Sequence, residues 1–196
     1  MLYFLSTPKS RKHERFDELN RVRALAESSH PAWRVEELTE VDVMGRKMPV
    51  VAFSMGTTDR SAPTLGLFAG VHGLERVGTH LALTYLEKLS RRMRWDRELR
   101  ERLERVRIVS IPLINPGGML LKWRSNPRGV DLMRNAPLDA EIEPSLFVGG
   151  QRATNKLPWY RGEEHQPMER ESRALVDFVR REMYPSPVSV ALDMHS

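Results

Sequence analysis

The chain has 196 residues, enough for one domain of ordinary size, with 40% hydrophobic and 29% charged residues. This balance excludes a disordered chain and a membrane-embedded one, and no apolar run approaches the roughly 20 residues that a membrane helix needs. Cysteine is absent. Disulfide scaffolds, thiolate zinc sites and cysteine nucleophiles are therefore excluded, and any metal must be held by His, Asp or Glu.

The net charge of +5 raises the question of a nucleic-acid partner. The segment from Lys88 to Arg107 holds nine basic and four acidic residues and accounts for the whole excess. Because these charges pair with one another, few counterions would be released on binding, and we expect no nucleic-acid partner. The N-terminus lacks the apolar core of a secretory signal, so we expect a cytoplasmic protein without a membrane partner.

The predicted elements alternate between helices and strands. Residues 1–15 are polar and basic and predict a flexible arm, and apolar spacing predicts a helix over 16–28. β-branched runs over 35–43 and 49–55 predict a hairpin. The later elements are a buried strand over 64–70, helices over 77–92 and 96–105, a strand over 106–114, an irregular segment over 119–165, a helix over 169–181 and a strand over 188–194. This order indicates an α/β fold with a mixed, mostly parallel sheet flanked by helices.

Two histidines and a glutamate follow predicted strands. His72 and Glu75 come after strand 64–70 at i,i+3 spacing, and His195 comes after the last strand. Because ligands bind at the carboxyl ends of strands in open α/β sheets, we expect these groups at one rim. Two imidazoles and a carboxylate match a catalytic zinc site, which activates water and polarises a carbonyl. A lone His-x-x-Glu is common in unrelated proteins, and His195 alone could be a core histidine, but the combination favours one metal ion.

The predicted irregular segment carries two further candidates, Arg124 and Arg134. Arginine binds carboxylates with two parallel hydrogen bonds and stabilises developing oxyanions. In a chain this rich in arginine, either residue could equally be a solvated surface group.

Six motifs together resemble the zinc carboxypeptidases of the M14 type. The similarity spans roughly residues 49–196, and the motifs occur in the order and spacing of that family. They are His72-Gly73-Leu74-Glu75, Asn115-Pro116-Gly117-Gly118, Trp123-Arg124, Gly129-Val130-Asp131-Leu132-Met133-Arg134-Asn135, Tyr160-Arg161-Gly162 with Met168-Glu169-Arg170-Glu171, and Leu192-Asp193-Met194-His195-Ser196.

The resemblance implies one zinc ion held by His72, Glu75 and His195. It also implies that Asp131 is the carboxylate that orients a zinc-binding histidine, as is general for such sites. We therefore expect residues 1–196 to form a single metallocarboxypeptidase-like catalytic domain.

The same resemblance implies that Arg124 is catalytic and stabilises the carbonyl oxyanion, and that Arg134 and Asn135 bind the substrate carboxylate. The family usually has Asn where this chain has Met133, and methionine cannot donate a hydrogen bond to a carboxylate. Two substrate classes therefore stay open. One is a peptide with a free C-terminus, and the other is an N-acyl amino acid, as in the related aspartoacylase and succinylglutamate desuccinylase group.

The family's general-base Glu lies downstream of the third zinc ligand, whereas this chain ends one residue after His195. We expect a truncated domain whose C-terminal part is missing and which is inactive without that Glu. The leading hypothesis is a zinc-dependent hydrolase of peptide or amide bonds. The alternatives are an N-acyl amino acid deacylase and, in another class, a catalytically inactive zinc-binding fragment.

Overall fold

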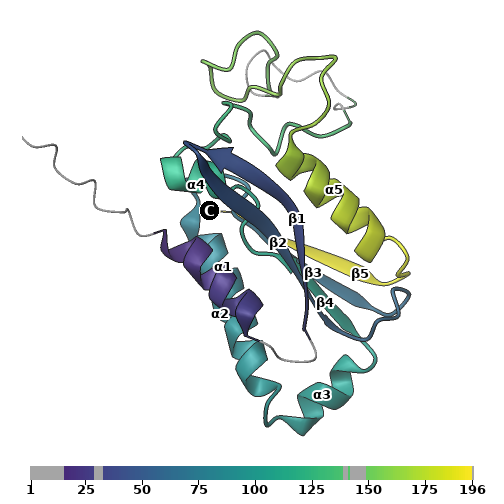
Figure 1. Ribbon diagram of the computed structural model, residues 1–196. Coiled ribbons are helices and arrows are strands. Elements are labelled where there is room, and N and C mark those ends of the chain that lie inside the picture. Colours follow the sequence, from purple (N-terminus) through teal and green to yellow (C-terminus); the bar gives the residue numbers. More distant parts are fainter. Residues whose placement is uncertain (1–15, 29–32, 139–140, 142–148, 196) are drawn as a thin grey trace, which may run out of the picture.

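The structure is a computed structural model that describes residues 16–28, 33–138, 141 and 149–195. The described chain forms a five-stranded sheet with helices on both faces (Figure 1). The arm predicted over residues 1–15 lies outside the described residues.

The order of the strands in the sheet is β1-β2-β4-β3-β5. Strand β3 pairs in parallel with β4 and β5, whereas β2 pairs antiparallel with β1 and β4. The elements are α1 (Asp17–Glu27), β1 (Trp33–Val43), β2 (Arg46–Gly56), β3 (Thr64–Ala69), α2 (Arg76–Arg92), α3 (Arg97–Leu103), β4 (Arg107–Ile111), α4 (Pro116–Leu121), α5 (Arg170–Glu182) and β5 (Ser189–Met194). The predicted α/β fold with a mixed sheet is confirmed, and so is the opening hairpin.

The core has two layers, one on each face of the sheet. Alternate residues of β2 face opposite sides, as strand geometry requires. Val51 and Phe53 pack in the cluster that includes residues of α1 and α2, and Val50 and Ala52 pack in the cluster that includes Phe178 of α5. Figure 1 shows α1 and α2 together on one face and α5 on the other. Both faces of the sheet are thus covered by apolar layers, and the candidate ligands follow the carboxyl ends of β3 and β5.

Two sequence-based predictions are wrong in detail. Strand β4 ends at Ile111, short of the predicted 114, and the next residue is Pro112, which has no N–H for the ladder. The segment predicted as irregular from residue 119 contains the second half of α4. The Asn115 side chain caps this helix by accepting a hydrogen bond of 2.8 Å from the Gly118 N–H.

Strand β5 and helix α2 both expose apolar side chains. Strand β5 lies at the edge of the sheet, and its Val190 and Leu192 are exposed. On α2, Val77, Leu81 and Tyr85 follow one another at i,i+4 spacing and are also exposed. None of the helices among the described residues has the length and apolar character needed to span a membrane.

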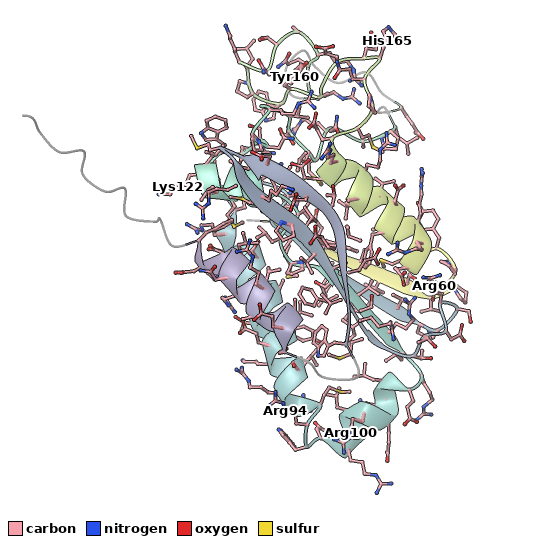
Figure 2. The ribbon with its side chains drawn as sticks, viewed as in Figure 1. Arg60, Arg94, Arg100, Lys122, Tyr160 and His165 are labelled. Carbon is pink, nitrogen blue, oxygen red and sulfur yellow. The ribbon has the colours of Figure 1, made fainter. Side chains whose placement is uncertain are left out.

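The arginine-rich segment lies far from the loop that precedes α5. Arg94 and Arg100 lie at one end of the molecule, and Tyr160 and His165 lie at the other (Figure 2). Within α3, Arg97 forms an i,i+4 ion pair of 2.6 Å with Glu101. The basic charge of this segment is therefore partly compensated by its own carboxylates.

Candidate metal centre

The parallel pairing of β3 and β5 brings two distant segments together. Ala69 and Met194 are partners at the carboxyl ends of these strands, so the residues after them emerge at the same edge. His72 follows three residues after Ala69, and His195 follows Met194 directly. Their ring centroids lie 5.0 Å apart. The sheet register therefore places the two predicted imidazoles side by side.

Glu75 lies between the two rings. Its Oε1 lies 3.0 Å from His72 Nδ1, and its Oε2 lies 4.0 Å from His195 Nε2. One ligand atom from each of the three residues can be chosen so that all lie within 4.8 Å of one another. Two ligands of a tetrahedral zinc ion lie about 3.4 Å apart, so a separation of 4.8 Å needs to close by about 1.4 Å. The donor types and their spacing thus fit one zinc ion.

The turn that carries His72 packs directly against α4. A Cβ atom on Gly73 would lie only 2.0 Å from the carbonyl carbon of Gly118, so only glycine permits this close approach. The Gly73 N–H donates to the Arg124 carbonyl over 3.4 Å. The same turn therefore connects the two candidate ligands to the segment that carries Arg124.

Asp131 is buried and accepts hydrogen bonds from three side chains at this site. His72 Nε2 lies 3.2 Å from Oδ1, while Arg124 Nε and Arg134 Nη1 donate to Oδ2 over 3.1 and 2.9 Å. Burial by itself would raise the pKa of Asp131, but the hydrogen bonds and charges of His72 and Arg124 outweigh it and lower the pKa to about 2. A carboxylate on Nε2 holds the His72 ring so that Nδ1 faces Glu75.

The two predicted arginines lie on the solvent side of Asp131. Arg124 Nη1 lies 3.5 Å from Glu75 Oε1. The Arg134 guanidinium lies 5.9 Å from the ring centroid of Trp159, a cation–π distance. The backbone of Trp159 has a positive φ of 61°, a conformation that is rare for bulky residues and that the sequence does not predict. Sequence analysis therefore missed the contact between Trp159 and Arg134.

The Asn135 side chain is engaged within the protein. Its Oδ1 accepts from the Glu169 N–H and its Nδ2 donates to the Arg161 carbonyl, each over 2.7 Å. A cleft of about 250 Å³ beside Asn135 is lined by residues that include Tyr160 and Glu163, and none of the three candidate ligands lines it. These contacts tie the loop to the start of α5, and a substrate contact for Asn135 stays a prediction.

Known proteins resemble this chain over most of its length. A family model described as zinc carboxypeptidase, of type M14, matches residues 23–196. The catalytic chain of human carboxypeptidase N is 29% identical over 175 residues, which cover 81% of this chain and 38% of that protein. The chain thus spans about two fifths of the length of this curated relative.

Solved structures show the same architecture. Bovine thrombin-activatable fibrinolysis inhibitor, solved in complex with a tick carboxypeptidase inhibitor, matches with a TM-score of 0.66 and 17% identity, over 91% of this chain and 60% of that one. Carboxypeptidase A from Helicoverpa armigera matches with a TM-score of 0.63 and 19% identity, over 89% of this chain and 43% of that one. The sheet and its flanking helices therefore have the carboxypeptidase-like fold that the sequence predicts.

Proposed function

Because the chain belongs to the zinc carboxypeptidase family, we propose that it carries the metal-binding part of a zinc-dependent hydrolase of peptide or amide bonds. The observation that carries this proposal is the convergence of His72, Glu75 and His195 from separate segments of the chain. Because the chain spans 38% of human carboxypeptidase N, the activity of the whole protein is itself part of the proposal.

The three side chains would hold one zinc ion through two imidazole nitrogens and a carboxylate oxygen. When bound, zinc would supply Lewis-acid chemistry, polarising the scissile carbonyl and lowering the pKa of water. His72 is almost fully buried, whereas the His195 side chain is 30% exposed.

The arginines give the substrate its orientation. Arg124 lies beside Glu75 and is partly exposed, so it can donate to an oxygen that gains negative charge during attack on the carbonyl. Arg134 is held between Asp131 and Trp159, and we propose that it binds the carboxylate of the substrate. A guanidinium carries five N–H donors, so a contact with Asp131 is compatible with a carboxylate on the same group.

Metal analysis tests the proposed zinc site directly. The wild-type chain is expected to bind about one zinc ion, the stoichiometry of a single catalytic site. His72→Ala removes the most buried donor and should abolish this binding. His165→Ala is the matched control, because His165 is exposed at the far end of the loop (Figure 2) and should leave binding unchanged. A wild-type chain without zinc, or equal loss in both variants, contradicts the proposal.

A second candidate substrate is an N-acyl amino acid. Met133, next to Arg134, is 48% exposed and offers no hydrogen bond to a carboxylate, which favours a smaller ligand with fewer polar contacts. Calorimetry with the zinc-loaded chain can compare a dipeptide, its C-terminally amidated form and an N-acetyl amino acid. Preference for the free dipeptide supports the carboxypeptidase-like function, and preference for the N-acetyl amino acid supports the second candidate. Arg134→Ala should weaken both ligands, with the exposed Arg128→Ala as control.

A further inference from the structure

Glu18 is a buried carboxylate outside the part of the chain that the family model matches, which begins at residue 23. It lies in α1 and is 1% exposed, while its neighbour Leu19 packs in the core. A buried carboxylate is costly unless it is paired and hydrogen-bonded. The partners of Glu18 therefore indicate what the residue does.

Glu18 binds the first turn of α2. Arg76 makes a two-point contact, with Nε donating to Oε1 over 2.8 Å and Nη2 to Oε2 over 2.5 Å. His80 Nε2 lies 2.8 Å from the same Oε1. Arg76 is the first residue of α2, and it directly follows the candidate ligand Glu75. Glu18 thus binds, through two hydrogen bonds, the residue next to Glu75, whose carboxylate lies between the two imidazoles.

A second ion pair joins the same helices farther from the site. Arg21 Nε donates to Glu87 Oε1 over 2.8 Å and Nη2 donates to Oε2 over 3.0 Å. Glu87 lies twelve residues after Glu75, about three helical turns along α2. Both pairs hold α1 against α2 and both reach His80, since Arg21 Nη1 lies 3.1 Å from His80 Nδ1. Only Glu18 binds Arg76, the residue next to Glu75.

The first turn of α2 depends on such outside contacts. Glu75 occupies the N-cap position, yet its side chain makes no capping hydrogen bond and instead faces the two imidazoles. Helix ends that lack a side-chain cap fray readily. A two-point contact on the next residue restricts both the position of the backbone and the direction of the Glu75 side chain.

We propose that Glu18 is a positioning residue that holds Glu75, through Arg76, in the orientation required for metal binding. The inference rests on the proposed function, because it takes Glu75 to be a metal ligand. Functional groups need to be held within about 0.5 Å of their productive geometry. Without the Glu18 carboxylate, Arg76 loses this two-point contact, and the N-terminal turn of α2 loses the restraint that it provides.

Comparison of Glu18→Gln with Glu87→Gln tests this inference in the whole chain. Each variant removes one charged partner between α1 and α2. Because Glu18 is buried and the Glu87 side chain is 29% exposed, a merely structural role predicts a larger loss of thermal stability in Glu18→Gln but no selective effect on metal. The positioning role predicts that Glu18→Gln weakens Co²⁺ affinity by about tenfold or more, the range for residues that orient ligands, and changes the d–d absorption spectrum of bound Co²⁺. Glu87→Gln should leave the affinity within about twofold of wild type and the spectrum unchanged, because Glu87 does not contact the turn that carries Glu75.

Further variants keep the test decisive. Arg76→Gln should reproduce the spectral change, and the double variant should show no additional loss, because both substitutions remove the same contact. If Glu18→Gln does not fold, Arg76→Lys, which keeps the charge but loses the two-point contact, takes its place. Wild-type affinity in the Glu18 variant, or equal weakening in the Glu87 variant, overturns the inference alone. A wild-type chain that binds no Co²⁺ refutes the metal site itself.

Discussion

Gly78 lies where α2 packs against the end of β5, and replacing it with alanine should disturb the proposed metal site from outside. A Cβ atom at this position would lie 2.0 Å from the carbonyl oxygen of Met194 and 2.9 Å from its carbonyl carbon. Met194 directly precedes His195, and Gly78 lies three residues after Glu75. The clash therefore falls between the two segments that carry these candidate ligands.

The size of the effect follows from the contact distances. Cβ atoms essentially never approach other heavy atoms closer than 3.0 Å, so α2 and β5 must separate by about 1 Å from their present 2.0 Å contact. Zinc–ligand distances tolerate only about 0.2 Å, so zinc affinity should fall by about 10- to 100-fold. Overpacking costs about 1–3 kcal/mol, and the better helix propensity of alanine offsets about 1 kcal/mol. The melting temperature should therefore fall by no more than about 8 °C.

Zinc affinity is measured by competition with a chromophoric chelator, and stability by thermal unfolding of the metal-free chain. Leu81→Ala on the exposed face of the same helix is the matched control and should leave zinc affinity unchanged. Wild-type zinc affinity in Gly78→Ala would refute the reasoning, because it would mean that the contact between α2 and β5 does not position His195.

Four further predictions concern stability and self-association. Arg107→Ala removes one of three arginines that contact the buried Glu182, leaving Arg60 and Arg181, and should cost about 1.5–3 kcal/mol of unfolding free energy in urea titrations. A cost below about 1 kcal/mol contradicts the importance of the pair. Burial raises the pKa of Glu182, but hydrogen bonds from Arg181 and Arg107 outweigh it and lower the pKa below its ordinary value of 4.5. The stability that this carboxylate contributes is therefore fully present above pH 4.5 and is lost as the pH falls through the lowered pKa. The difference in melting temperature between wild type and Glu182→Gln should therefore narrow on acidification. Burial raises the pKa of Glu171, so Glu171→Gln should raise the melting temperature at pH 7, and the gain should vanish at a pH where Glu171 is protonated. Leu81→Glu should reduce self-association in sedimentation experiments, because it interrupts the exposed apolar face of α2.

Much of the fold could be predicted because its signals are local. Period-two and period-3.6 patterns of apolar residues follow directly from strand and helix geometry. The ends of the opening hairpin, α2 and α5 were therefore predicted within two residues, except the start of β2, which was predicted three residues late. The candidate ligands could be predicted for a related reason. His72 and His195 each follow an apolar strand, and the carboxyl ends of parallel strands meet at one edge of a sheet.

Other features were decided only by tertiary contacts. Arg124 and Arg134 lie within seven residues of Asp131, but His72 lies 59 residues away, so the contact between His72 and Asp131 depends on two distant segments meeting. Glu18 had a faint signal, since it lies four residues before the buried Val22 on the inner face of α1, but its partner Arg76 lies 58 residues away. The residue types of the proposed site are thus written in the sequence, whereas their orientation is set by packing between segments that are distant in the chain, because side-chain direction depends on what the backbone brings near.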